Sequence, residues 1–115
     1  MSGTQSILMM GTDEMLLATR TRILEGAGFQ VVRARDLDEA ERHLRDGTVS
    51  LLILCYTLPP LDCRRALSIA QAVAPHVKTL ALTAPYGPCI EADDVFVEHV
   101  SGPLKLIETV KNLLS

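Results

Sequence analysis

Aromatic side chains are scarce in this chain of 115 residues: they make up 3% of it, and tryptophan is absent. The core must therefore be aliphatic, and the stacking platforms that bind single-stranded nucleic acid are missing. The chain also lacks an excess of positive charge, because 11 basic and 14 acidic residues give a net charge of −3 at pH 7. Without a basic surface, we do not expect nucleic acid among its partners.

Long apolar runs are absent as well. The longest, Leu51–Cys55, has the length of a strand, whereas a helix that crosses a bilayer needs about 20 apolar residues. The first five residues, Met1–Gln5, lack the basic stretch of a signal peptide. We therefore expect a cytoplasmic protein with no membrane partner.

Cysteines are few and odd in number. Cys55, Cys63 and Cys89 show no framework spacing, which predicts reduced thiols rather than disulfides. Hydrophobic residues make up 48% and charged residues 22%, as in ordinary globular domains. No linker or repeat divides the sequence, so a single domain is expected over residues 1–115.

Short apolar runs alternate with stretches of helical periodicity along the chain. Strands are expected over residues 7–10, 30–34, 49–54, 79–82 and 95–97. Helices are expected between them: the first capped by Thr12 with Asp13 in its first turn, the second opened by the pair Asp36 and Glu39, and the third after a loop over residues 57–62. The last helix is expected to start at Gly102-Pro103, with Leu104, Ile107, Val110 and Leu114 on its apolar face. This alternation predicts an α/β fold with a parallel sheet between two layers of helices.

One connection is too short for a full helix. Only residues 84–94 join the last two strands, and they include Pro85 and Pro88. A parallel crossover, helix included, needs at least about 10–12 residues. The fourth helix is therefore expected to be shortened or absent.

Four segments carry a resemblance to a known family. They are Ile7–Met10, Leu51–Asp62 with its Leu58-Pro59-Pro60-Leu61-Asp62 loop, Leu80–Ala84, and Ala92–Val97. With them the chain resembles, from Ser6 to Leu114, the receiver domain of two-component response regulators. The resemblance implies a flavodoxin-like three-layer sandwich with a five-stranded parallel sheet in the order 2-1-3-4-5.

The resemblance also implies a phosphorylation pocket, and this sequence departs from it. The family's phosphoacceptor aspartate falls on Cys55, its pair of acidic residues on Gly11 and Thr12, its lysine on Glu98, and the proline after that lysine on His99. Only the family's Ser or Thr is retained, as Thr83.

These replacements remove the chemistry of the pocket. Mg²⁺ prefers carboxylate oxygens, a thiol cannot form an acyl phosphate, and a glutamate at position 98 repels a phosphoryl group. Asp13, the nearest remaining acid, is expected to interact with the helix dipole. We therefore predict a phosphorylation-independent module that binds protein partners in a signalling pathway and has no cofactor and no catalytic residues.

Three other interpretations stay open. The chain could be a receiver phosphorylated at a non-standard residue. It could be a thiol sensor at the Cys55 edge of the sheet. It could hold zinc, since Cys55, Cys63, Cys89 and His99 are all zinc-ligand types that map to the same edge of the sheet. An enzyme is not expected, because the sequence has no Gly-rich phosphate loop and no nucleophile elbow.

A shortened fourth helix would also expose one face of the domain. Receivers commonly pair through the fourth helix, the fifth strand and the fifth helix. The resemblance thus predicts a homodimer through the exposed face. Its predicted residues are Val95, Phe96, Val97, Leu106 and Val110.

Overall fold

The computed structural model describes residues 6–11, 13–54, 60–83 and 94–114, with the backbone alone at 16, 60, 82–83 and 94–103. Strands and helices alternate over most of this length. They are β1 (Ser6–Met10), α1 (Glu14–Gly26), β2 (Gln30–Ala34), α2 (Leu37–Arg45), β3 (Val49–Leu54), α3 (Pro60–Val73), β4 (Lys78–Thr83), β5 (Asp94–Val97) and α4 (Glu98–Leu114). The predicted fourth helix falls on residues 84–93, which lie outside the described residues.

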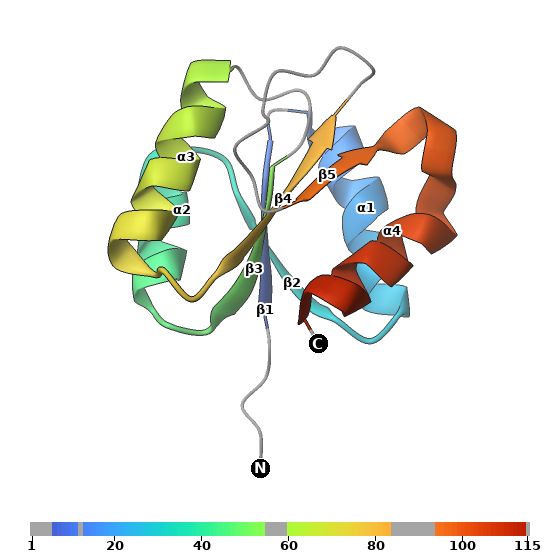
Figure 1. Ribbon diagram of the computed structural model, residues 1–115, viewed down its shortest axis with the longest axis horizontal. Helices are drawn as coiled ribbons and strands as arrows, with labels where there is room; N and C mark the ends of the chain where they lie inside the picture. Colours follow the sequence, from blue (N-terminus) through green and yellow to red (C-terminus); the bar gives the residue numbers. More distant parts are fainter. Residues whose placement is uncertain (1–5, 12, 55–59, 84–93, 115) are drawn as a thin grey trace.

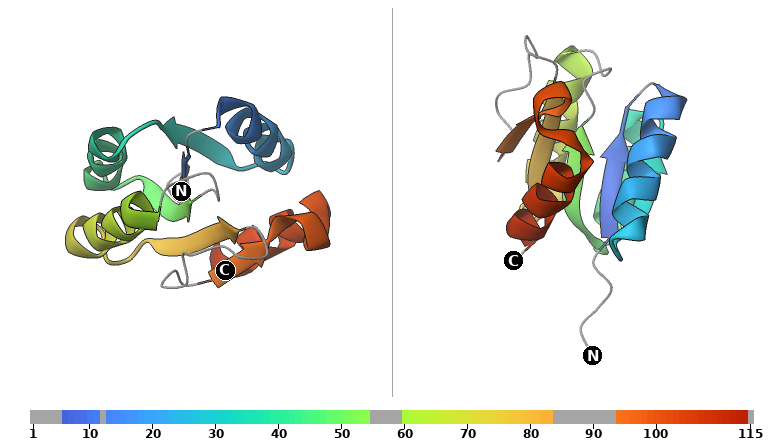
Figure 2. Two further views of the ribbon diagram at one scale, coloured as in Figure 1. Left: turned by 90° about the horizontal axis from the view of Figure 1, so that it is seen from above. Right: turned by 90° about the vertical axis from the view of Figure 1, so that its right-hand side faces the viewer.

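The strands form one parallel sheet in the order β2-β1-β3-β4-β5. This is the predicted 2-1-3-4-5 order of a flavodoxin-like fold. Helices α1 and α4 cover one face of the sheet, and α2 and α3 cover the other (Figures 1 and 2). The predicted three-layer α/β architecture is thus confirmed.

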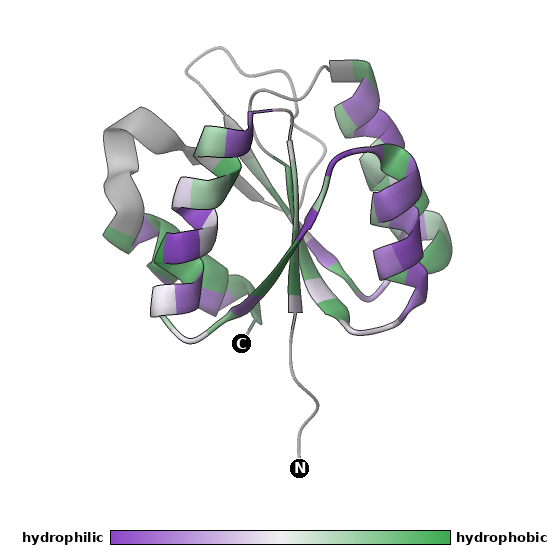
Figure 3. Ribbon diagram, turned by 180° about the vertical axis from the view of Figure 1, so that it is seen from behind, coloured by the Kyte–Doolittle hydropathy of each residue, from purple (hydrophilic) through white to green (hydrophobic). Residues whose placement is uncertain are grey.

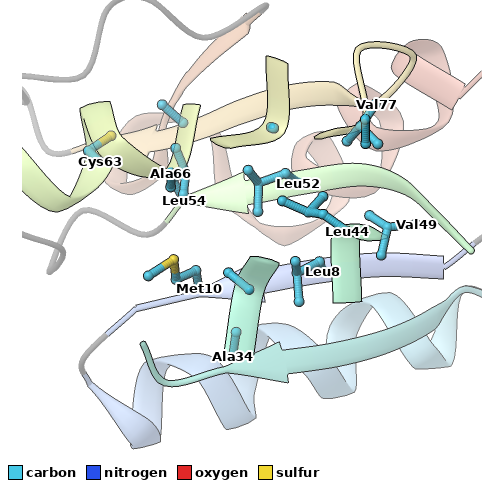
Figure 4. Packing of buried hydrophobic residues seen from close by; sticks show 14 residues of the cluster. Leu8, Met10, Ala34, Leu44, Val49, Leu52, Leu54, Cys63, Ala66 and Val77 are labelled. Carbon is cyan, nitrogen blue, oxygen red and sulfur yellow. The ribbon is translucent and has the colours of Figure 1, made fainter. Parts of the chain in front are cut away.

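The core is aliphatic and is divided by the sheet. Strand β1 is buried along its whole length, and β3 is buried at all positions but Ser50. Because side chains alternate along a strand, Ile7 and Met9 pack toward α1 and α4, and Leu8 and Met10 pack toward α2 and α3. Figure 4 shows the second half of the core. In Figure 3, β1 is green, while hydrophilic residues in purple are dense on α2.

The second helix begins with the predicted capping residues. The Asp36 carboxylate accepts a hydrogen bond from the backbone N–H of Glu39 at 2.9 Å. The Glu39 carboxylate accepts from the N–H of Arg35 at 2.8 Å, one residue before the position of a standard capping box. After the helix, Gly47 takes φ +83°, a conformation that favours glycine, and the chain turns into β3.

Two helices start earlier than predicted. Helix α3 begins at Pro60, inside the predicted loop, because proline fits the first position of a helix. Helix α4 begins at Glu98, directly after β5, and not at Pro103. Pro103 therefore lies inside the helix, where it has no N–H to donate to the preceding turn. Figure 1 shows α4 changing direction between its orange and red parts.

Among the helices of the described segments, none has both the length and the apolar character needed to cross a membrane.

Candidate functional site at the carboxyl edge of the sheet

All five strands end at one edge of the sheet, which we call the carboxyl edge. They meet there because all the strands are parallel, and the last residues of β1 and β3, Met10 and Leu54, are direct register partners. The positions at this edge are Gly11 after β1, Cys55 after β3, Thr83 at the end of β4 and Glu98 after β5. Ligands of open α/β sheets bind at this edge.

The structure places most of the predicted pocket positions along the chain without describing their side chains. Gly11 is buried directly after β1. Thr83 is the last residue of β4 and pairs in register with Val97. Glu98 and His99 are the first two residues of α4. Thr12 and Cys55 lie outside the described residues.

Because α4 starts at residue 98, the local backbone influences which residue type is favoured at this position. Glu98 is the first residue of a helix, where the partial positive charge of the helix N-terminus favours an acidic side chain. A lysine, which the resemblance to receivers implies for this position, would be disfavoured at the start of a helix, so a glutamate agrees with the local backbone.

Asp13, the nearest acid to the missing pair, is engaged with the start of α1. Its carboxylate accepts a hydrogen bond from the backbone N–H of Met15 at 3.0 Å, and its carbonyl accepts from the N–H of Leu17 at 3.0 Å. Helix α1 begins at Glu14, so Asp13 is the capping residue. The prediction that Thr12 caps this helix with Asp13 in the first turn is wrong by one position.

A solvent-exposed ion pair lies beside this cap. The Arg35 guanidinium is 3.8 Å from the Glu14 carboxylate, and the two side chains are 81% and 77% exposed. Pairs this exposed contribute little to stability. Glu14 therefore faces a cation at the surface and is not held in a pocket.

The residues at the edge do not suit Mg²⁺, the ion that the receiver fold implies. Such an ion needs carboxylate oxygens, and the position directly after β1 is a buried glycine, Gly11. The Asp13 carboxylate, two residues on, already accepts the N–H of Met15. Within the residues that the structure describes, no cluster of three or more His, Cys, Asp or Glu could hold a metal.

Cys63 differs from its prediction. It is buried in α3, with 3% of its surface exposed, and it is disulfide-bonded. The prediction of reduced thiols is therefore wrong for Cys63, and in this state its sulfur is not a thiolate that could bind zinc. The other residues of the predicted zinc set, Cys55, Cys89 and the His99 side chain, lie outside what the structure describes.

Two exposed apolar side chains near the carboxyl edge were missed in the sequence. Met15 is 81% exposed in the first turn of α1, and Leu61 is 58% exposed in the first turn of α3. Both helices start after strands that end at this edge. The signal that could have found them is their position in the first helical turn, before the buried stripe of each helix begins.

The predicted dimer face needs a correction. Leu106 and Val110 are 3% and 0% exposed, because they pack against Leu80 and the neighbouring strands from within α4. They belong to the core of the domain and are not available to a partner. Leu104, which the periodicity placed on the buried face, is 82% exposed instead. The side chains of residues 95–97 lie outside what the structure describes.

Comparison with solved structures identifies the fold. A CheY-like response regulator receiver domain from Methanospirillum hungatei superposes with a TM-score of 0.82 and 24% sequence identity, covering 97% of this chain and 94% of that one. The receiver domain of the sensor histidine kinase PA1611 from Pseudomonas aeruginosa, which holds a magnesium ion in its active-site cleft, has a TM-score of 0.82 and 20% identity over 98% of both chains.

The receiver domain of the hybrid histidine kinase CckA has a TM-score of 0.76 and 22% identity, covering 96% of this chain and 99% of that one. No protein-family model matches the sequence. No curated protein matches it at a significant level. The chain thus has the flavodoxin-like fold of receiver domains, and sequence identities at this level establish the fold alone.

Proposed function

We propose that the chain is an atypical receiver domain that acts in two-component signalling, or phosphorelay, as a protein-interaction module and does not depend on aspartate phosphorylation. One observation carries the proposal. In a sheet with the strand order of receivers, the residues directly following β1 and β3 are Gly11 and Cys55, where that family has carboxylates.

The chemistry of the edge supports an output by binding rather than catalysis. A thiol at position 55 gives no acyl phosphate, and Asp13 is engaged with the backbone of α1. Glu98, at the first position of α4, supplies no cation for a phosphoryl group. A signal must therefore reach this domain through contacts with a partner or through a different covalent change.

Partner proteins in the cytoplasm are the proposed ligands. Met15 and Leu61 offer apolar contact area in the first turns of α1 and α3. Leu104 offers apolar contact area on α4. The proposed homodimer surface therefore consists of Leu104 and residues 95–97, without the buried Leu106 and Val110. Apolar side chains with this degree of exposure are suited to protein contacts when they gather in one patch.

Intact-mass measurement tests the central claim. The full chain is incubated with Mg²⁺ and acetyl phosphate, beside the Pseudomonas aeruginosa receiver as a positive control. We expect no gain of a phosphoryl group in this chain and a gain in the control. A single adduct on this chain would contradict the proposal, and its loss in Asp13→Asn would assign it to a receiver with relocated chemistry. Asn keeps the capping acceptor of Asp13, so this variant should remain folded.

The homodimer has its own test. Solution mass across a wide range of concentrations should show association of the wild-type chain, and Leu104→Glu should shift it toward the monomer. Glu suits an exposed helix position, and Met15→Glu serves as the matched control on another helix. A strictly monomeric wild type would overturn the dimer and leave the interaction module with other partners.

A further inference from the structure

We propose that a groove between α3 and the start of β4 binds an acidic segment of a partner protein. The groove has a volume of about 410 Å³, which lies within the range of ligand-binding clefts. Residues from both elements line it, chiefly Arg64, Leu67, Ser68 and Gln71 of α3, and Val77 and Thr79 at the start of β4. This inference rests on the proposed role of the domain as a protein-interaction module, and it gives that role a surface and a partner of stated chemistry.

The groove follows from the spacing of its lining residues. On α3, positions 64, 67, 68 and 71 are separated by three, four and seven residues, so they form one side of the helix over two turns. On the strand side, Val77 and Thr79 are two residues apart and lie on the same face of the sheet, which α2 and α3 cover (Figure 2). Leu80, the next residue, packs on the opposite face.

The groove combines an apolar floor with a polar rim. Ala70 and Val77 are 2% and 7% exposed and belong to the core cluster under α3. Arg64, Ser68 and Gln71 are exposed and carry hydrogen-bond donors. An apolar centre with a polar rim is the usual anatomy of a protein interface. We therefore expect the occupant to place an apolar side chain on the floor and hydrogen-bond acceptors at the rim.

The charges around the groove favour an acidic occupant. Residues 60–79 hold three cations, Arg64, Arg65 and Lys78, against one acid, Asp62, although the whole chain has a net charge of −3. All three cations are exposed. Among the described lining residues, Arg64 is charged and none is a carboxylate. Because a guanidinium forms paired hydrogen bonds with a carboxylate, an acidic segment is attracted to this side of the domain and held at Arg64.

A second hollow, on α2, lacks this complementarity. It mixes acidic and basic side chains, which are Glu39, Arg42, His43, Arg45 and Asp46. Arg45 also forms an ion pair of 2.7 Å with Glu41 on the same helix. The charges of this hollow balance one another, so it selects no partner of one sign. Arg42 is exposed there and provides a matched control for Arg64.

The test selects peptides from a random dodecapeptide library displayed on phage, with the full chain as the immobilised target. We expect enriched peptides to combine aspartate or glutamate with an apolar residue. Arg64→Glu should weaken the binding of such a peptide by about tenfold or more, as expected for losing a charge-assisted hydrogen bond. Arg42→Glu should leave the affinity unchanged. The same peptide with lysine in place of its acidic residues should bind Arg64→Glu more tightly than it binds the wild type.

Two further measurements locate the peptide. Its binding should shift the backbone amide signals of Ser68, Gln71 and Thr79 in NMR spectra, and Ser68→Trp, which fills the groove, should abolish binding. Positions 42, 64 and 68 are exposed, so the variants should keep their fold, which thermal unfolding checks.

Several results would overturn the proposal. These are a library that yields no peptide, enriched peptides that are neutral or basic, and equal affinities for the wild type and Arg64→Glu. Dissociation of a wild-type homodimer by Arg64→Glu would also overturn it, because the groove would then hold a second copy of the chain. None of these results bears on phosphorylation, which the intact-mass measurement decides separately. Failure of the groove and failure of the proposed function are therefore distinguishable.

Discussion

The carboxylate of Asp13 and the backbone N–H of Met15 are joined by a hydrogen bond of 3.0 Å, and this contact caps α1. The resemblance to receivers implies five departures along the sheet edge, at Gly11, Thr12, Cys55, Glu98 and His99, and Asp13 is the acid nearest to the pair that it implies. Its engagement with the helix terminus explains why an aspartate can be present beside the edge without belonging to a phosphorylation pocket. The cap therefore has consequences for stability that can be separated from signalling.

Asp13→Ala should lower the free energy of unfolding by about 1 kcal/mol, the usual effect of losing a capping side chain. Asp13→Asn keeps an oxygen acceptor and should lower the free energy of unfolding by only a few tenths of a kcal/mol, because it loses just the favourable interaction of the negative charge with the helix N-terminus. Urea unfolding of both variants measures the two losses. Equal losses in the two variants would show that the charge, and not the hydrogen bond, stabilises the start of α1.

Two nearby leucines of α4 should lose very different amounts of stability on the same substitution. Leu106 is 3% exposed and Leu104 is 82% exposed. Leu106→Ala leaves a cavity against the sheet and should cost about 2–5 kcal/mol, whereas Leu104→Ala should change stability by no more than about 0.5 kcal/mol. Denaturant unfolding of the two variants checks the orientation of the helix, and similar losses would contradict it.

The sequence-based prediction was partly wrong about which side chains of α4 face the core. The prediction that Leu104 is buried relied on the spacing of Leu104, Ile107, Val110 and Leu114. Val110 is buried and Ile107 and Leu114 pack against the core, but Leu104 is exposed and Leu106 is buried in addition. The start of this helix was predicted at Pro103, because proline favours the first turn of a helix. The helix begins at Glu98 instead, and Pro103 lies inside it.

The sheet, in contrast, was predictable to the residue in places. The expected strands over residues 30–34 and 49–54 have those bounds in the structure. For residues 49–54 the reason is that an almost continuous apolar run of this length suits a strand that is covered on both faces. The disulfide of Cys63 had no comparable signal, because pairing depends on which segments meet in space and spacing alone does not determine it.

Substitution by alanine should change the stability of the chain in opposite directions at Gly26 and Gly47, although both glycines have open space around them. An added Cβ would meet nothing within 4 Å at either Gly26 or Gly47, but Gly47 has φ +83°. Gly47→Ala should therefore cost about 1–2 kcal/mol of backbone strain. Gly26 is the last residue of α1, and Gly26→Ala should stabilise the chain by about 0.4–1 kcal/mol, because alanine restricts the unfolded state. Thermal unfolding distinguishes them, and a stabilising Gly47→Ala would contradict the turn geometry.

On the exposed surface of α4, Lys105 and Glu108 shift each other's titration. The Lys105 ammonium donates a hydrogen bond of 2.7 Å to the Glu108 carboxylate. This bond, with the attraction between the charges, lowers the pKa of Glu108 and raises the pKa of Lys105. Because the folded-state pKa of Glu108 is lowered, its contribution to stability is present above the unfolded pKa and is lost as the pH falls through the folded value. The contribution of Lys105 is lost at the alkaline end, as the pH rises through its raised pKa.

Lys105→Met should return the pKa of Glu108 toward the usual value of a glutamate, which a carbon-detected NMR titration of the carboxyl group measures. Lys78→Met, which removes a positive charge at the start of β4, is the control and should leave the Glu108 pKa unchanged. Since both partners are exposed and screened by solvent, unfolding at neutral pH should hardly change in Lys105→Met. Equal shifts in the two variants would show that Glu108 responds to the net charge of the domain and not to its neighbour on the helix.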